Sequence, residues 1–223
     1  MLVVNRFNTD TVHEVALHGE RHFPLSEMPK EVIIKEIVAD RERLEKLLGR
    51  IVKGMAYAYG STDDRTVEIL KMCGIKYSRT VKSSENFSIP SDWLRLSPTC
   101  HHNNPKLFEL ADKFMEEMHE EPYYSYRTGP SLFYLWGHAY EFDNDNNWGL
   151  IEKFAEKMGK RDDIWYCTNG EFYDYIKAFE SLEYSLQGDI VHNPSCLPVY
   201  YNNRGKYIVI KPGETVSPGY IWG

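Results

Sequence analysis

The chain has 223 residues, of which 42% are hydrophobic and 14% aromatic, and its net charge is -7. This length suits one domain of roughly 200 residues with an appendage. The acidic balance and the lack of a Lys/Arg cluster argue against a nucleic-acid partner. No run approaches the roughly 18 apolar residues of a membrane span, and no signal peptide is recognisable. We therefore expect a cytoplasmic protein that does not enter a membrane and keeps its four scattered cysteines reduced.

The first half of the chain predicts alternating strands and helices. An apolar run at residues 12–17 alternates as a short strand does, and a helical period follows from Pro29 to Gly49. Residues 51–58 predict the next strand. Asp63 then caps a helix that ends near Gly74, and residues 75–80 form a further strand.

The same alternation continues in the second half. Residues 93–99 alternate like a strand, residues 104–118 predict a helix, and residues 132–137 are a continuous apolar run typical of a buried strand. A helix over 146–158, a strand over 164–167 and a helix capped by Thr168 or Asn169 follow. Strands separated by single helices predict a parallel sheet, closed or wound, with helices outside.

The pattern changes after residue 180. Residues 199–201 and 206–210 read as two strands of a β-hairpin, with the turn at residues 202–205. We therefore predict an α/β domain over residues 1–179 and a C-terminal β extension over residues 180–223.

Histidines gather directly after the predicted strands. His18 and His22 follow the first strand with HxxxH spacing, His101 and His102 follow residues 93–99, and His138 follows residues 132–137. In βα barrels, the carboxyl ends of the strands carry the chemistry. Positions i and i+4 share a helix face, so His18 and His22 could also bind one cation. The alternative is a polar loop with two surface histidines.

The order of three motifs resembles the polysaccharide deacetylase family, which includes the nodulation-type chitooligosaccharide deacetylase domain. These motifs are HGERH at residues 18–22, MAYAYG at residues 55–60 and LWGH at residues 135–138. SDW at residues 91–93 resembles a further motif. The resemblance covers residues 12–178 and implies a distorted (β/α) barrel of carbohydrate esterases.

The resemblance implies a metal-dependent hydrolase that removes N-acetyl or O-acetyl groups from a carbohydrate polymer or oligosaccharide. His18 and His22 would bind a divalent ion, for which zinc is the first expectation and cobalt, nickel and manganese are alternatives. His138 would protonate the leaving amine, and the backbone amide of Tyr59 would stabilise the oxyanion. Tyr57, Trp93 and Trp136 would contact the sugar.

The chain also departs from the family pattern. No adjacent aspartate pair, which supplies the base and the third metal ligand in the family, precedes His18. About six strands are predicted where a closed barrel needs seven or eight, so the first unit is expected to be missing. Ala56 and Ala58 replace the usual arginine and proline. His101 or His102 could be a replacement ligand, whereas we interpret Asp63-Asp64 as a helix cap.

Two other functions remain open at this point. A barrel without catalysis could bind sugar or serve in assembly, and an exposed parallel strand edge would favour a homo-oligomer. A metal-free relative of the fold that opens cyclic amides in purine breakdown is the third alternative, although retention of both histidines at HxxxH spacing favours a metal.

Overall fold

The computed structural model describes residues 13–118, 130–203 and 206–218. Two compact units make up the chain. The first contains residues 1–119 and 129–166, and the second contains residues 120–128 and 167–223. None of the helices in these described ranges is long and apolar enough to cross a membrane.

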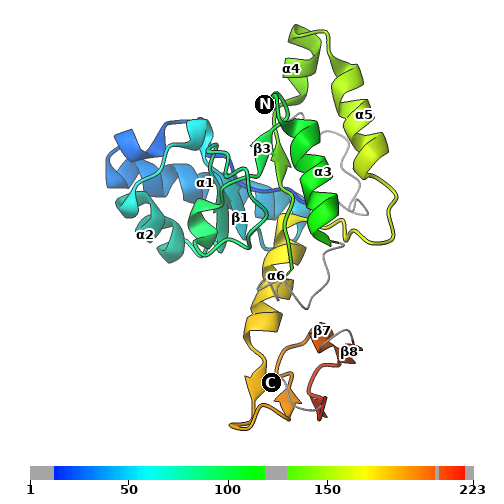
Figure 1. Ribbon diagram of the computed structural model, residues 1–223. Coiled ribbons are helices and arrows are strands. Elements are labelled where there is room, and N and C mark those ends of the chain that lie inside the picture. Colours follow the sequence, from blue (N-terminus) through cyan, green and yellow to red (C-terminus); the bar gives the residue numbers. More distant parts are fainter. Residues whose placement is uncertain (1–12, 119–129, 204–205, 219–223) are drawn as a thin grey trace. The chain divides into compact units, whose positions relative to one another are not determined.

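Short parallel strands form the centre of the first unit (Figure 1). β1 (Gly54–Ala56) pairs with β2 (Tyr77–Arg79), and β3 (Cys100–His101) pairs with β4 (Leu135–Trp136). Single parallel bridges join Leu17 to Met55 and Arg79 to Leu96. Because parallel strands end at the same edge of a sheet, residues 18, 57 and 80 begin on one edge of the β1–β2 sheet, and residues 102 and 137 begin on one edge of the β3–β4 sheet. These two edges are here called the strand-end rim. The described strands do not close into a barrel.

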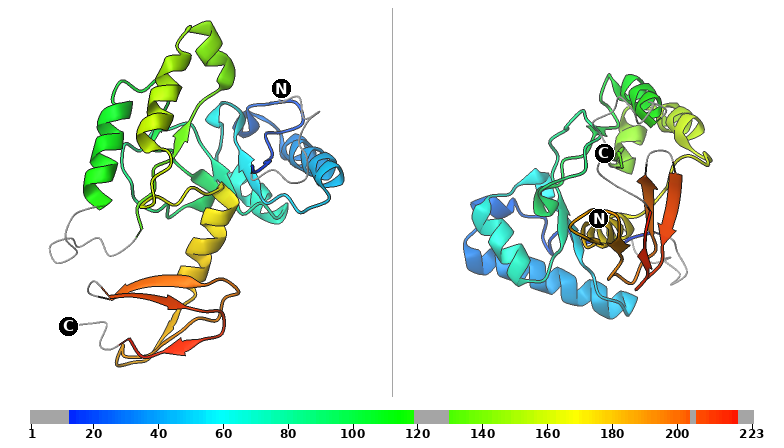
Figure 2. Two further views of the ribbon diagram at one scale, coloured as in Figure 1. Left: turned by 90° about the vertical axis from the view of Figure 1, so that its right-hand side faces the viewer. Right: turned by 60° about the horizontal axis from the view of Figure 1, so that its bottom comes forward.

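Helices lie on both sides of these strands, as both views in Figure 2 show. α1 (Lys30–Leu48) and α2 (Asp64–Met72) pack on one side. Pro29 precedes α1, and Gly49 ends it in the left-handed region at φ 64°. Asp63 caps α2 by accepting the N–H of Thr66. The predicted helices and the cap assignment of Asp63 are confirmed.

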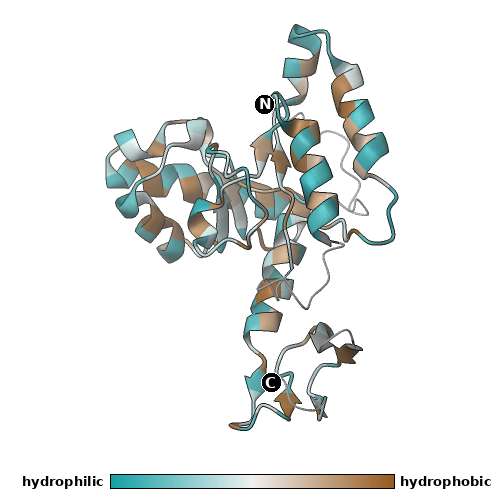
Figure 3. Cartoon of the chain, viewed as in Figure 1, coloured by the Kyte–Doolittle hydropathy of each residue, from teal (hydrophilic) through white to brown (hydrophobic). Residues whose placement is uncertain are grey.

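The other side of the first unit carries the remaining helices. They are α3 (Leu107–Met118), α4 (Ala139–Asn144) and α5 (Trp148–Met158). Figure 3 shows hydrophilic and hydrophobic residues in turn along α3 and α5, as expected of amphipathic helices. Their apolar faces pack in one core cluster, which includes Leu107, Phe114 and Met158.

Three predicted strands differ from the structure. The described part of the first, residues 13–17, forms only a single bridge at Leu17. Residues 93–95 form the 3-10 helix η3 (Trp93–Arg95), because the Asp92 carboxylate accepts the N–H of Leu94 and turns the chain. The strand in this region is β3, so His101 lies in a strand instead of after one. Residues 164–167 form no strand. Helix α4, which begins directly after His138, was not predicted.

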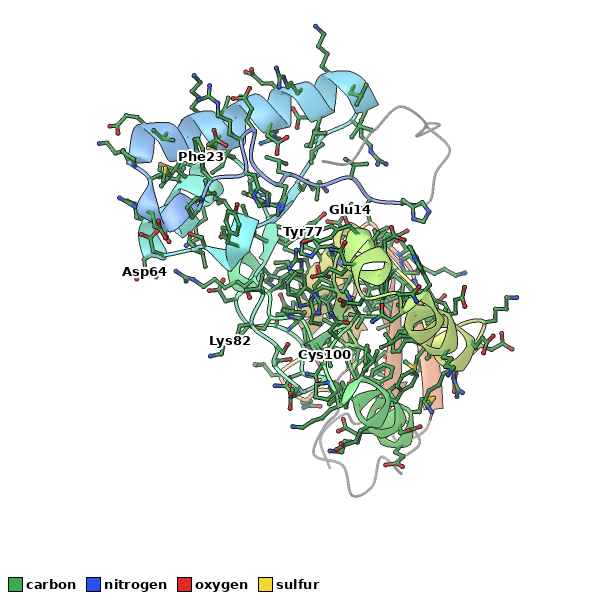
Figure 4. The ribbon with its side chains drawn as sticks, turned by 90° about the horizontal axis from the view of Figure 1, so that it is seen from above. Glu14, Phe23, Asp64, Tyr77, Lys82 and Cys100 are labelled. Atoms are coloured by element: carbon green, nitrogen blue, oxygen red, sulfur yellow. The ribbon has the colours of Figure 1, made fainter. Side chains whose placement is uncertain are left out.

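The first segment is attached to the strands by a close contact at Gly54. A Cβ there would lie 2.3 Å from Cε2 of Tyr77 and 2.8 Å from Oε1 of Glu14. The Tyr77 hydroxyl donates a hydrogen bond to the same Glu14 carboxylate, and Figure 4 labels both residues. Glycine at position 54 therefore leaves room for the tyrosine ring that joins β2 to the chain before Leu17.

The second unit combines one helix with short antiparallel strands. Thr168 and Glu171 form a capping box at the start of α6 (Asn169–Glu180). β5 (Glu183–Tyr184), β6 (Val191–His192) and β9 (Thr215–Val216) form one sheet, and β7 (Val199–Asn203) pairs with β8 (Lys206–Ile210). The turn residues 204–205 lie outside the described residues. Helix α6 groups with these strands, whereas the sequence boundary at residue 179 places it in the first domain.

Candidate functional site

Two carboxylates of α1 hold the loop that carries the HxxxH pair. The backbone N–H groups of His18 and Gly19 donate to Oδ2 of Asp40 at 2.8 and 2.9 Å. The N–H of Arg21 donates to Oε2 of Glu36 at 2.7 Å, and Glu36 is only 2% exposed. Glu36 and Asp40 are four positions apart on α1 and therefore share one helix face. The loop is fixed by tertiary hydrogen bonds to this face.

The two imidazoles of this loop lie against each other. Nδ1 of His18 lies 2.7 Å from the carbonyl oxygen of Ala56, so Nδ1 carries the proton and donates. Nε2 is thereby left as the basic nitrogen, the arrangement that metal-binding histidines use. Burial lowers the pKa of His18, which favours the neutral form that a metal requires. The His22 ring lies 4.6 Å from the His18 ring, centroid to centroid, in an edge-on contact.

Backbone turns bring Tyr59 next to this pair. His22 and Tyr59 both have left-handed backbones, with φ of 60° and 59°. Their ring centroids are 4.6 Å apart, and Tyr59 is 68% exposed. A left-handed conformation is uncommon outside glycine and tends to mark functional positions. The HxxxH loop and the loop after β1 therefore meet through the His22–Tyr59 contact.

A second cluster forms around the carboxylate of Glu141. Its Oε2 accepts the backbone N–H of His138 at 2.9 Å. The same oxygen lies 3.3 Å from Nδ1 of His138, 3.2 Å from Nε2 of His101 and 3.6 Å from Nε2 of His102. Burial on its own would raise the pKa of Glu141, but the His138 N–H and the nearby imidazoles outweigh it, so the pKa is lowered. Glu141 is therefore an anion that organises three histidines.

Hydrogen bonding favours a proton network over a metal site in this cluster. His101, His102 and Glu141 are the only group of three potential ligands found in the part of the chain that the structure describes. The backbone N–H of Asn103 donates to Nδ1 of His101 at 3.1 Å, so the proton of the neutral ring is on Nε2. That Nε2–H points to Glu141 and cannot also be a metal ligand. Neither nitrogen of the buried His102 has a hydrogen-bond partner.

The two clusters are connected through Arg79 and Trp136. Arg79 ends β2, and its Cζ lies 4.3 Å from the centroid of the Trp136 ring on β4. The Trp136 ring also contacts the rings of His101 and His138, at centroid distances of 4.5 and 5.7 Å. Besides burial, the Arg79 charge contributes to the lowered pKa of His18. Arg79 therefore interacts with groups of both clusters.

The structure places the three aromatic residues expected to contact the sugar in different surroundings. Tyr57 is 1% exposed and its hydroxyl donates to the carbonyl of Leu94, so it is a core residue and not a substrate contact. Trp93 lies half-buried in η3. Trp136 lies on the rim, but the Arg79 guanidinium covers one face of its ring. The prediction that Tyr57 contacts the sugar is therefore wrong.

Four polar residues of the site were not foreseen from the sequence: Glu36, Asp40, Arg79 and Glu141. Glu141 had a local signal, because an acidic residue three positions after a helix start is typical of a capping box. The signal was missed because the residue before α4 is His138 and not the serine or threonine usual at the start of a capping box. The other three depend on how α1 and β2 pack, which no local pattern specifies.

Comparison with known proteins gives a family match for the first third of the chain. The family model described as polysaccharide deacetylase matches residues 3–78. No curated protein matches.

Solved structures add a likeness of fold. The Streptococcus pyogenes deacetylase PplD, solved with acetate, is 23% identical over 36% of this chain and 35% of its own, with a TM-score of 0.34. A polysaccharide deacetylase from Bacillus cereus is 25% identical over 38% of this chain and 26% of its own, with a TM-score of 0.32. A Mycobacterium smegmatis structure assigned to the same enzymes is 16% identical, covers 75% of this chain and 64% of its own, and has a TM-score of 0.51. This chain thus spans less than two thirds of each.

Proposed function

We propose that the protein hydrolyses acetyl groups from a carbohydrate with the help of a divalent metal ion, because residues 3–78 match the polysaccharide deacetylase family model. The substrate would be an N-acetylated or O-acetylated polymer or oligosaccharide. The proposal is supported by the ring contact between His18 and His22 and by the contacts of Trp136 with Arg79 and with His138.

His18 and His22 are suited to hold the metal ion. The Ala56 carbonyl fixes the His18 tautomer, and Asp40 fixes the backbone on which the ring is mounted. When bound, zinc or a similar ion would polarise the acetyl carbonyl and make a water molecule acidic enough to attack near neutral pH. The described residues place no third His, Cys, Asp or Glu ligand beside this pair.

His138 is suited to deliver a proton to the leaving group. Nδ1 of His138 is buried and lies 3.3 Å from the Glu141 carboxylate without a hydrogen bond to it. The negative charge favours the proton on Nδ1, which would leave Nε2 to exchange a proton with the substrate. The His138 side chain is 42% exposed, so a substrate can reach it. Glu141 is in turn held by the His138 backbone and by His101. The amide of Tyr59, beside His22, would face the developing oxyanion.

A sugar-binding protein without catalysis is the second candidate. It is favoured by the incomplete ligand set at His18 and His22 and by the alanine at position 56, where the family pattern has arginine. In that case the rim would retain carbohydrate binding but release no acetate.

Metal content and acetate release from an N-acetylated chitooligosaccharide distinguish the two candidates. The purified protein is expected to retain about one zinc ion and to release acetate, and the double variant His18→Ala/His22→Ala is expected to lose both. His138→Ala should retain the metal and lose acetate release, by about 100-fold or more. His192→Ala, in the second unit, serves as the control. A protein that binds the oligosaccharide, binds no zinc and releases no acetate would support the non-catalytic candidate and contradict the hydrolase.

A further inference from the structure

Arg79 is a half-buried cation that forms no ion pair with the residues that the structure describes. Its guanidinium donates from Nη1 to the carbonyl of Thr80 at 3.0 Å, and no carboxylate in the described parts of the chain forms an ion pair with it. Burial lowers the pKa of Arg79. Arg95 shows the usual alternative, because it pairs with Asp64 at 2.6 Å and with Asp92 at 3.1 Å. A partly buried charge left unpaired is costly to a protein, so a charge kept in this state suggests a ligand.

The guanidinium of Arg79 is held in place by two contacts. The guanidinium lies over the Trp136 ring, where a cation is attracted to the aromatic face. This contact limits its movement without using any of its N–H donors. Within residues 13–118, 130–203 and 206–218, one of its five donors has a hydrogen-bond acceptor, the carbonyl of Thr80. A planar guanidinium with free donors matches a planar carboxylate, which it can bind through two parallel hydrogen bonds.

We propose that Arg79, held against Trp136, forms a carboxylate-binding subsite at the strand-end rim, between the His18 loop and His138. The carboxylate has two potential sources, and naming them depends on the proposed deacetylase function. One is acetate, which the reaction would release. The other is an acidic sugar unit, such as a uronic acid, next to the acetylated unit.

Direct binding tests the subsite without any need for catalysis. The full chain is titrated with sodium acetate and, separately, with sodium glucuronate at constant ionic strength, and glucose is the uncharged control. The readout is the NMR signal of the Arg79 Nε–H group, together with calorimetry. The variants are Arg79→Met, which removes the charge, and Arg79→Lys, which retains the charge and loses the planar fork. Arg95→Met is the matched control, because its guanidinium already has carboxylate partners.

We expect the wild-type protein to bind at least one carboxylate, and Arg79→Met to weaken this binding about 10- to 100-fold. Arg79→Lys should weaken it by less, and Arg95→Met should leave it unchanged. Tighter binding of acetate would assign the subsite to the product, and tighter binding of glucuronate would assign it to the substrate. Equal binding by the wild type and Arg79→Met, or no binding of either carboxylate by the folded wild type, would overturn the proposal. Both results are independent of whether acetate release is ever detected.

Discussion

Replacing Glu141 with glutamine tests whether this carboxylate positions His138 for proton transfer. The glutamine has the same shape and can still accept the His138 backbone N–H, but it no longer places a negative charge 3.3 Å from Nδ1. Two opposite unit charges about 4 Å apart attract by about 1 kcal/mol in water and by about 4 kcal/mol near a protein surface, and about 1.4 kcal/mol corresponds to a tenfold change in rate. We expect kcat for acetate release to fall about 10- to 100-fold while KM changes little.

The second unit supplies a control with the same position in a helix. Glu171 stands three residues after Thr168 at the start of α6 and accepts the Thr168 N–H at 2.8 Å, with no histidine beside it. Glu141→Gln and Glu171→Gln should each destabilise their own helix start, by about 1 kcal/mol. Only Glu141→Gln should change kcat and the pH profile of the reaction. If both variants retained the wild-type kcat, the carboxylate would be a helix cap alone and the reasoning would be refuted.

The lowered pKa of Glu141 also predicts how the stability of the fold changes at acid pH. A carboxyl whose pKa is lower in the folded state stabilises the fold above its unfolded value of 4.5, and this contribution is lost as the pH falls toward the folded value. The free energy of unfolding of the wild type should therefore decrease below about pH 4.5, and Glu141→Gln should remove part of that decrease. Urea unfolding between pH 3 and pH 6 measures it.

Three further predictions concern neighbouring residues. Glu36→Gln should lower the free energy of unfolding in urea by about 1–3 kcal/mol, because Glu36 is buried and accepts a loop N–H; an unchanged value would contradict its role. Gly137→Ala should lower the free energy of unfolding by about 1–3 kcal/mol, because the new Cβ would lie 1.9 Å from Nδ1 of His102. Gly149→Ala is the control, because a Cβ there meets no atom within 4 Å and should leave the stability unchanged. Burial lowers the pKa of His101, so stability should decrease as the pH falls below 6.5, and His101→Gln should flatten this dependence, measured by thermal unfolding.

The helices of this protein could be predicted where their ends carry local signals. Pro29 and Gly49 bound α1, Asp63 caps α2, and Thr168 begins α6, each through groups within a few residues of the helix end. Strands were harder, because alternation of apolar residues does not distinguish a strand from a 3-10 turn. At residues 93–99 the Asp92 side chain decides the outcome.

In the site, too, features set by neighbouring residues in the sequence could be predicted, and contacts between distant residues could not. The position of His138 after the parallel strand β4 could be predicted, because strand direction follows from the alternation of strands and helices. His18 follows a single parallel bridge at Leu17 instead of a full strand. The partners of these histidines could not, because Asp40, Arg79 and Glu141 reach them through packing between elements. Tyr57 was misassigned for a related reason, since motif membership says nothing about which face of the chain is buried.

The proposed proton donor is also the residue from which α4 begins, and α4 has only six residues. Helices this short open easily, because few hydrogen bonds oppose their fraying. Warming should therefore loosen the His138 side chain while the cores on either side of the strands are still intact. Enzymatic turnover would then decrease at temperatures where calorimetry still records a folded protein. A substitution that lengthened α4 would raise the highest temperature at which the protein is active.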